Sequence, residues 1–250
     1  MKTWLLNGKP ILAEKAQSLD VFSQEYVSGV FETFRSFSGN FWRIEDHFVR
    51  LAKSATLLDI IVPVSDEVIF EALRSLLTVD MDFRYKFWTD GVDWWIKVLP
   101  LENLDFTQGI AVVDQVFARS LAAAKHGAPF YPAARKYCAE HAAFEVLWFD
   151  ESDILLEGSI TNVFAIIDGV LCTPSLGNIL PGLMRSWILD QEVPVKLRDI
   201  SREQLLSAHE IFCTNMVRGI IPVARWGDWQ AQSFSMAEKL TETLHSNLPK

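Results

Sequence analysis

An acidic side chain closes an apolar run in the segment LLEGSITNVF, residues 155–164. A carboxylate such as Glu157, at the inner end of a buried strand, is costly unless a positive group meets it. One such group is the protonated ring nitrogen of a bound cofactor. This pairing would keep a pyridinium charged, which is the form in which pyridoxal phosphate withdraws electrons. The alternative is that Glu157 merely ends an exposed strand at a turn, and this segment alone favours that alternative.

Two basic side chains and a helix start could complete the same chemistry. Lys125 lies among small apolar residues in AAAKHGAPFYP, where loss of solvation favours the neutral amine that forms imines. Arg50, in HFVRLAKSA, is predicted on the inner side of an amphipathic helix, a position suited to a phosphate. Gly182, in NILPGLMRS, marks a helix start, where free backbone amides favour an anion. Each residue alone is better explained as an ordinary loop, surface or turn residue, but their joint appearance in this order is not.

The composition indicates a globular chain with material for a large core. Half of the 250 residues are hydrophobic, enough for one large domain or two modest ones. Only 22% are charged and no segment is of low complexity, which argues against disorder. The net charge of −9 argues against nucleic acid as a partner, because phosphate binding needs a basic face.

The sequence carries no feature typical of a membrane, secreted or metal-binding protein. The N-terminal MKTWLLNGKPI has too short an apolar run for a signal peptide, and apolar stretches such as IIVPV are far shorter than a membrane span. The three cysteines are scattered without CxxC spacing, and the five histidines are isolated from one another. We therefore expect a cytoplasmic protein that binds no metal, membrane or nucleic acid.

The elements that must position these residues fall into two groups. The first group, in a domain over 1–104, is predicted to be a sheet with two helices. A Ser-Gly-Asn turn at 38–40 indicates a hairpin, and apolar spacing predicts the helices. In chain order, the expected elements are a hairpin over 29–42, helices over 43–60 and 65–79, and strands over 82–89 and 92–100.

The second group follows a polar, turn-prone boundary at 101–109 and forms a larger, β-rich domain over 109–250. We place Lys125 in this domain, after a strand. Helices are predicted to start at 181–182 and at Ser201, where Ser-Arg-Glu-Gln suits a capping box. The strands are expected at 109–117, 144–149, 153–157, 161–167, 169–172, 210–215 and 219–226. No glycine-rich phosphate loop is present, so a nucleotide-binding fold is not expected.

Taken together, the motifs resemble those of class IV aminotransferases, the fold-type IV pyridoxal phosphate enzymes. This family includes branched-chain aminotransferases, D-amino acid aminotransferases and 4-amino-4-deoxychorismate lyases. The resemblance extends over most of the chain, and the ordered set is specific although no single piece is. The motifs are GVFETFR (29–35), HFVRLAKSA (47–55), AKHG (124–127), LLEGSITNVFAI (155–166), TPSLGNILPGLMR (173–185) and TNMVRGIIPV (214–223).

The resemblance implies an α/β (α+β) fold of two domains, with pyridoxal 5'-phosphate in the interdomain cleft, usually in a homodimer. Lys125 resembles the Schiff-base lysine, Arg50 the arginine that binds the cofactor phosphate, and Glu157 the glutamate that faces the pyridine nitrogen. Leu180 resembles the side chain that packs on the ring. The rest of the phosphate cradle is implied to be the backbone amides of Leu183, Met184, Asn215 and Met216.

The chain departs from the family pattern at two places. Segment 14–28 matches poorly, and two prolines follow Lys125. Lys125 is nevertheless favoured because it lies 32 positions before Glu157, close to the family separation. The competing Lys136 falls in the amphipathic helix AARKYCAEHAAF, where a solvent-facing role is the ordinary expectation. The family pattern also suggests Tyr131 as the contact to the ring hydroxyl.

The segment TNMVRGIIPV resembles the lyase form of the family. The predicted reaction therefore converts 4-amino-4-deoxychorismate, an intermediate of folate biosynthesis, to 4-aminobenzoate and pyruvate. The alternatives are a branched-chain or D-amino acid aminotransferase and, second, a non-catalytic relative. Arg218, and more weakly Arg84, are candidates to bind a substrate carboxylate, because guanidinium groups match carboxylates well.

Overall fold

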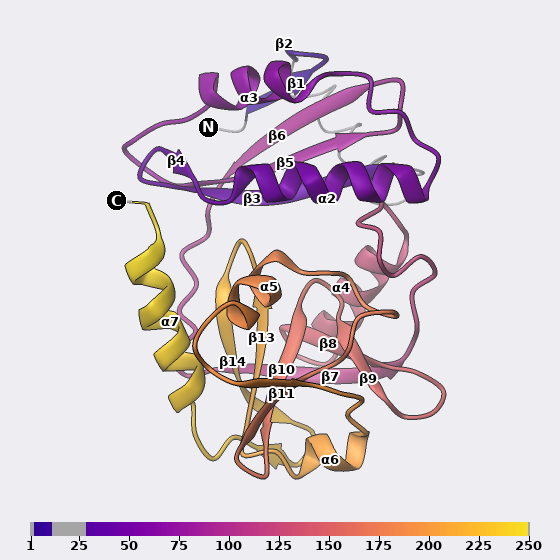
Figure 1. Ribbon diagram of the computed structural model, residues 1–250, viewed down its shortest axis with the longest axis vertical. Helices are drawn as coiled ribbons and strands as arrows, with labels where there is room; N and C mark the ends of the chain where they lie inside the picture. The colour runs from indigo at the N-terminus through magenta and orange to yellow at the C-terminus, as the bar shows by residue number, and fades with distance from the viewer. Residues whose placement is uncertain (1–2, 12–28, 250) are drawn as a thin grey trace. The chain divides into compact units, whose positions relative to one another are not determined.

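The computed structural model describes residues 3–11 and 29–249 (Figure 1). The poorly matching segment 14–28 thus lies outside the described residues. The backbone divides into two compact units. Unit 1 comprises Met1–Asn103, Ala124–Pro129 and Leu248–Lys250, and unit 2 comprises Leu104–Ala123 and Phe130–Asn247. Each unit combines a sheet with helices, so the expected mixed α/β class is confirmed.

Among its described residues, unit 1 contains an antiparallel sheet of order β2-β1-β6-β5-β3-β4 and the helices α2 and α3. The predicted hairpin is confirmed, because Gly39, at φ 77°, turns the chain from β3 into β4. Both predicted helices and both later strands of this region are confirmed within a few residues. The bounds are β1 Thr3–Leu6, β2 Lys9–Pro10, β3 Val30–Phe37, β4 Asn40–Phe41, α2 Ile44–Leu57, α3 Asp66–Ser75, β5 Phe83–Thr89 and β6 Trp94–Pro100.

The two faces of the unit 1 sheet differ in character. Alternate residues of β3, β5 and β6, such as Phe34, Tyr85 and Ile96, pack with Phe48 of α2 and Leu73 of α3 in one core. Figure 1 shows α2 lying along β3. The intervening residues point to the other face, which α2 and α3 do not cover. That face carries basic and aromatic side chains: Phe31, Arg35, Arg84, Lys86, Trp88, Trp95 and Lys97.

Unit 2 is built on a larger sheet of order β12-β11-β10-β13-β14-β7-β8-β9, with β15 paired to β14. The strands β7, β8 and β14 pair in parallel, and β10, β13 and β14 pair antiparallel. The bounds are β7 Ile110–Val116, α4 Phe130–Glu140, β8 Glu145–Phe149, β9 Leu155–Gly158, β10 Asn162–Ile167, β11 Val170–Thr173, α5 Leu183–Leu189, β12 Val195–Leu197, α6 Arg202–Leu206, β13 Glu210–Asn215, β14 Gly219–Trp226, β15 Trp229–Gln230 and α7 Ser235–Asn247.

Local chemistry explains most of these boundaries. Helix α6 begins with the predicted capping box, in which Ser201 and Gln204 satisfy each other's backbone amides. Helix α4 begins earlier than expected, because Pro132 is tolerated in a first helical turn. Helix α7 was not predicted, and its start is held by the carboxylate of Glu210, which accepts hydrogen bonds from the amides of Met236 and Ala237.

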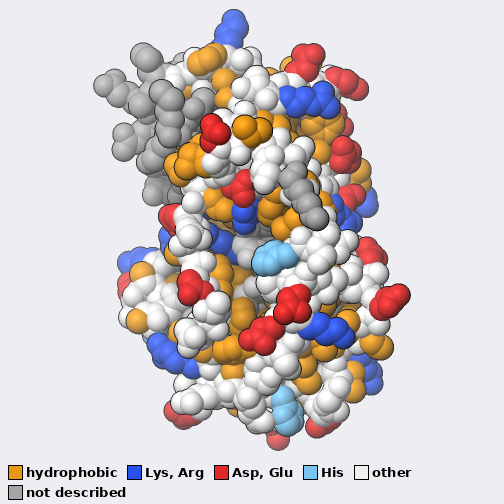
Figure 2. All heavy atoms as spheres, turned by 90° about the vertical axis from the view of Figure 1, so that its left-hand side faces the viewer, with side chains coloured by type: hydrophobic (Ala, Val, Ile, Leu, Met, Phe, Trp, Pro, Cys, Tyr) orange, Lys and Arg blue, Asp and Glu red, His pale blue; other side chains and the backbone are white. Residues whose placement is uncertain are grey.

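No single charge dominates the face of the molecule that Figure 2 presents. Figure 2 shows acidic and basic side chains interspersed with apolar ones over the face it presents. Among residues 3–11 and 29–249, every helix falls short of the length and apolar character that a membrane crossing requires.

Candidate active site

In unit 1, a buried acid lies between two basic side chains. Strand alternation turns Glu32 toward α2, and His47 and Arg50 lie three residues apart on one face of that helix. Arg50 Nε and Nη2 each donate to the Glu32 carboxylate at 2.7 Å, and His47 Nδ1 lies 2.7 Å from the same carboxylate. Glu32 is fully buried and Arg50 is 7% exposed. Arg50 is thus held by a bidentate buried ion pair on the inner side of the helix, as its position in the sequence indicated.

The charge states in this cluster follow from burial and pairing. Burial alone would raise the pKa of Glu32, but the charges and hydrogen bonds of Arg50 and His47 lower that pKa to about 2. Burial lowers the pKa of His47 and outweighs the opposing effect of Glu32. The cluster therefore contains an ionised Glu32 carboxylate beside a neutral His47 imidazole at neutral pH.

The Glu32 carboxyl should make the free energy of unfolding depend on pH in the acidic range. Because its pKa falls from 4.5 to about 2 on folding, its contribution is present above pH 4.5 and is lost as the pH falls toward 2. That contribution is roughly 3 kcal/mol, at about 1.36 kcal/mol per pKa unit. Urea titrations at stepped pH should show the free energy of unfolding falling more steeply in the parent than in Glu32→Gln between pH 4.5 and 2. Equal slopes would contradict the assignment.

Lys125 is anchored to the same cluster through its backbone. Its amide donates to Ser54 Oγ at 3.0 Å, its carbonyl accepts from the Phe31 amide at 3.1 Å, and Ser54 Oγ donates to the Arg50 carbonyl at 2.9 Å. The Lys125 ammonium nitrogen lies 4.8 Å from the centroid of the Phe31 ring. Lys125 and Arg50, predicted from distant segments, are therefore brought together in unit 1.

The placement of Lys125 corrects one expectation. Its segment comes after β7, which ends at Val116, but the isolated bridge between Val30 and His126 joins the segment to β3. Segment 124–129 therefore belongs with unit 1 rather than with the second domain. Gly29, directly before β3, leaves room for the Trp88 side chain, since a Cβ there would lie 2.6 Å from Trp88 Nε1. The competing Lys136 is 79% exposed and lies 3.8 Å from Glu140, as its helical position indicated.

In unit 2, Glu157 meets a positive group that the sequence analysis did not identify. Its Oε1 accepts a hydrogen bond from Arg119 Nε at 2.8 Å and lies 2.8 Å from Arg119 Nη2 in an ion pair. Its Oε2 accepts from the Leu180 amide at 3.0 Å. The Glu157 side chain is 5% exposed, so the exposed-turn alternative is wrong. The positive group that pairs with the Glu157 carboxylate is therefore Arg119, 38 positions upstream. The sequence signal for this pairing was limited to the presence of a basic residue, Arg119, six positions before Lys125.

A second buried glutamate fixes the turn that follows Glu157. The carboxylate of Glu145, 1% exposed, accepts hydrogen bonds from the amides of Ser159 and Ile160 and from the hydroxyl of Thr161. Burial raises the pKa of Glu145, and these hydrogen bonds oppose the increase. The chain is so tight here that a Cβ on residue 158 would lie 2.1 Å from Thr161 Oγ1. The turn therefore has little freedom to displace the preceding carboxylate.

The start of α5 is shaped around a glycine. A Cβ at Gly182 would lie 1.7 Å from Oδ1 of Asn162, whose Nδ2 donates to the Leu180 carbonyl at 3.0 Å. The N-cap residue of α5, Gly182, has no side chain with which to cap the first backbone amides of the helix. The start of α5, with its predicted phosphate-binding amides, is thus adjacent to Leu180, whose own amide donates to Glu157.

The remaining predicted residues lie at the β13–β14 turn and elsewhere. Oδ1 of Asn215 accepts hydrogen bonds from the amides of Val217 at 3.0 Å and Arg218 at 2.8 Å, and its Nδ2 lies 3.5 Å from the Ile160 carbonyl. Asn215 therefore fixes this turn and links it to the turn after Glu157. Met216 is buried. Tyr131 lies in the first turn of α4, and Arg84 lies on the face of β5 that α2 and α3 do not cover.

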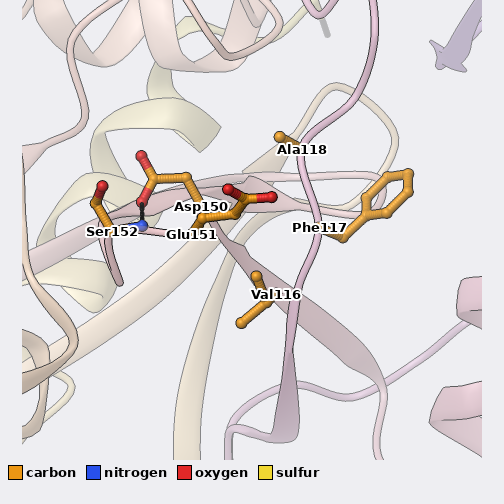
Figure 3. A pocket seen from close by; sticks show the side chains of 6 residues that line it. All are labelled: Val116, Phe117, Ala118, Asp150, Glu151 and Ser152. Atoms are coloured by element: carbon orange, nitrogen blue, oxygen red, sulfur yellow. Dashed lines mark hydrogen bonds between the residues drawn. The ribbon is translucent and has the colours of Figure 1, made fainter.

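Among the described residues, neither a metal-binding cluster nor the pocket of unit 2 adds a residue to the candidate active site. Within the part of the chain that the structure describes, no group of three or more His, Cys, Asp or Glu side chains could hold a metal ion. A pocket of about 390 Å³ in unit 2 is lined by Val116, Phe117, Ala118, Asp150, Glu151 and Ser152 (Figure 3). Its Asp150 accepts hydrogen bonds from the amides of Ser152 and Ile154 and so shapes a turn. No predicted site residue lines this pocket.

Comparisons with known proteins agree with the motifs. A family model described as amino-transferase class IV matches residues 29–226. The D-alanine aminotransferase of Staphylococcus epidermidis is 25% identical over 249 residues, covering 88% of this chain and 87% of the relative. The probable branched-chain-amino-acid aminotransferase of Thermotoga maritima is 26% identical over 248 residues, covering 92% and 89%.

Solved structures share the fold over nearly the whole chain. The branched-chain amino acid aminotransferase of Escherichia coli superposes with a TM-score of 0.81 at 22% identity, covering 99% of this chain and 94% of that one. The 4-amino-4-deoxychorismate lyase of Pseudomonas aeruginosa superposes with a TM-score of 0.77 at 22% identity, covering 98% and 99%. These likenesses confirm the fold and do not choose between the two reactions.

Proposed function

The chain belongs to the class IV aminotransferase family, whose enzymes depend on pyridoxal phosphate, and from this premise we propose that it transfers the amino group of an amino acid. The observation that carries the proposal is Lys125, held by its backbone beside the Arg50–Glu32 pair on a segment of matching sequence. The curated relatives reported above are aminotransferases of D-alanine and branched-chain amino acids. They support the transfer reaction over the lyase reaction that the sequence motif favoured.

The residues present fit pyridoxal phosphate. Unit 2 offers a buried, oriented carboxylate in Glu157 and an amide group at α5 whose glycine leaves a space that a Cβ would fill. Thr214 Oγ1, buried at the end of β13, has no hydrogen-bond partner among the described residues. Unit 1 offers an amine and a guanidinium in Lys125 and Arg50. An aromatic, anionic aldehyde matches these groups in charge and chemistry.

The proposed roles follow from these contacts. When bound, pyridoxal phosphate supplies an electron sink for the carbon that carries the amino group. Lys125 would hold the cofactor covalently and then move the proton of that carbon. Glu157, oriented by Arg119 and the Leu180 amide, would keep the ring nitrogen protonated. The guanidinium of Arg50 would bind the phosphate together with the amides of Leu183, Met184, Asn215 and Met216.

A lyase acting on 4-amino-4-deoxychorismate is the second candidate. The observation that favours it is the form of segment 214–223, in which Asn215 caps the turn leading to Arg218. Both reactions use the same lysine and carboxylate, so the substrate decides between them. Family membership speaks against the non-catalytic alternative. The family resemblance further supports a cytoplasmic homodimer.

Borohydride trapping tests the assignment of the lysine. Reduction of the cofactor-loaded protein followed by peptide mapping should place the label on Lys125, because its amine is the one held in the matching segment. Label on the exposed Lys136 would contradict the assignment. Assays with D-alanine, leucine and 4-amino-4-deoxychorismate then separate the reactions. Keto acids from the first two indicate the transferase, whereas 4-aminobenzoate indicates the lyase.

A further inference from the structure

The imidazole of His47 is a buried polar group of unit 1 that has no role in the proposed chemistry. The residue is 0% exposed, its Nδ1 lies 2.7 Å from Glu32 Oε2, and its ring centroid lies 5.2 Å from that of Phe34. Its other nitrogen, Nε2, is buried and has no hydrogen-bond partner among residues 3–11 and 29–249. An unpaired buried polar atom destabilises a fold, so packing alone does not explain a histidine here.

The surroundings of His47 determine which of its nitrogens carries the proton. Burial lowers the pKa of His47, and the positive charges of Arg50 and Lys125 lower it further, against the opposing effect of Glu32. A neutral imidazole has a single N–H, and an ionised carboxylate can only accept. The proton is therefore assigned to Nδ1, which donates it to the Glu32 carboxylate, and Nε2 is left as an acceptor.

This hydrogen bond from His47 fixes the carboxylate that holds Arg50. Oε2 of Glu32 accepts from Arg50 Nη2 and from His47 Nδ1, each at 2.7 Å, and Oε1 accepts from Arg50 Nε at 2.7 Å. The terminal torsion of a glutamate side chain is broad unless its surroundings restrict it. Without the N–H of His47, the carboxylate could rotate and carry the paired guanidinium with it. His47 therefore limits the positions that the Arg50 guanidinium can take.

We propose that His47 is a positioning residue for cofactor binding: its Nδ1–H fixes the Glu32 carboxylate, which in turn sets the Arg50 guanidinium for the cofactor phosphate. This inference rests on the proposed function, in which Arg50 binds that phosphate. His47 acts through Glu32 and Arg50, so its effect is on cofactor affinity and not on proton transfer. Because Arg50 is assigned to the phosphate, the effect of His47 should be confined to ligands that carry one.

A matched pair of substitutions tests the role of the Nδ1–H. Asparagine can place an amide N–H close to the position of Nδ1, whereas leucine has the same branched shape and no hydrogen-bond donor. Both variants leave a similar space beside Phe34, so they differ mainly in the hydrogen bond to Glu32. In absorbance titrations of the cofactor-free full chain, His47→Leu should raise the pyridoxal phosphate Kd about tenfold. His47→Asn should restore most of the affinity, to within about threefold of the parent Kd.

Pyridoxal separates an effect on phosphate binding from a general loss of the site. It lacks the phosphate, so its Kd should be the same in the parent, His47→Asn and His47→Leu. The inference is overturned by equal pyridoxal phosphate Kd values in the two variants, or by an equal loss of pyridoxal affinity in His47→Leu. His47→Phe keeps a ring against Phe34 but has no N–H, so it should behave as His47→Leu does and takes its place if the leucine variant does not fold.

The Arg50→Ala variant and borohydride trapping separate failure of this inference from failure of the proposed function. If the pyridoxal phosphate Kd rises in Arg50→Ala but not in folded His47→Leu, Arg50 keeps its proposed role and the inference about His47 is wrong. Failure of borohydride to label any lysine of the cofactor-loaded parent would instead overturn the proposed function. That result does not involve His47, so the two failures are distinguishable.

Discussion

The Glu157→Gln variant is expected to bind pyridoxal phosphate but to lose turnover by roughly 100- to 1,000-fold, the size of effect seen when one preorganised electrostatic group is removed. An amide carries no charge, so it cannot hold a proton on the ring nitrogen. The amino-bearing carbon then gives up its proton more slowly, while the contacts to the phosphate are unchanged. The measurement is kcat with saturating cofactor, together with the cofactor Kd by absorbance titration.

The surroundings of Glu157 predict a smaller cost in stability. Both carboxylate oxygens accept hydrogen bonds from fixed donors, Oε1 from the Arg119 guanidinium and Oε2 from the Leu180 amide. Either orientation of a glutamine amide sets its NH2 group against one of these donors. One buried polar contact is lost, which costs about 1–3 kcal/mol.

Glu210→Gln is the matched control for this experiment. Glu210 is another buried carboxylate of unit 2. It accepts hydrogen bonds from two backbone amides, which belong to the start of α7. Its replacement should cost similar stability and leave kcat close to that of the parent. Near-normal turnover in Glu157→Gln, or an equal loss in both variants, would show that the Glu157 carboxylate does not act on the cofactor.

Short-range patterns in the sequence predicted most of the secondary structure. Turn chemistry at Gly39 and the capping box at Ser201 depend on residues a few positions apart, and both are present in the structure. Helix α7 was missed because its start depends on Glu210, a carboxylate from a strand earlier in the chain. Placing Lys125 failed for a similar reason, since its segment pairs with β3, about 95 positions upstream.

The candidate site shows the same contrast between features that depend on nearby residues and features that depend on residues distant in the sequence. The motifs located Arg50, Lys125 and Glu157, but not the groups that hold them in place. Glu32 and Arg119 pair with residues 18 and 38 positions away, and no periodicity relates members of such pairs. A buried charge shows that a partner must exist, whereas only the fold shows which residue it is.

The Arg50→Ala variant is expected to lose stability as well as cofactor affinity. Removing the guanidinium leaves the fully buried Glu32 carboxylate without its bidentate partner, and breaking a buried ion pair in this way costs roughly 3–5 kcal/mol. If Arg50 also binds the phosphate, the cofactor Kd should rise by about one to two orders of magnitude, since a charge-assisted hydrogen bond contributes about 1.5–3 kcal/mol. Urea denaturation and cofactor titration measure the two effects separately.

Two comparisons separate the structural part of this effect from cofactor binding. Arg35→Ala breaks the partly exposed pair with Asp82, so its cost should stay below about 1 kcal/mol, with an unchanged cofactor Kd. Adding Glu32→Gln to Arg50→Ala removes the unpaired charge, so the double variant should regain stability while its cofactor affinity stays low. Recovery of both properties in the double variant would mean that Arg50 acts only through Glu32. A persistent loss of affinity would instead support a direct contact between Arg50 and the phosphate.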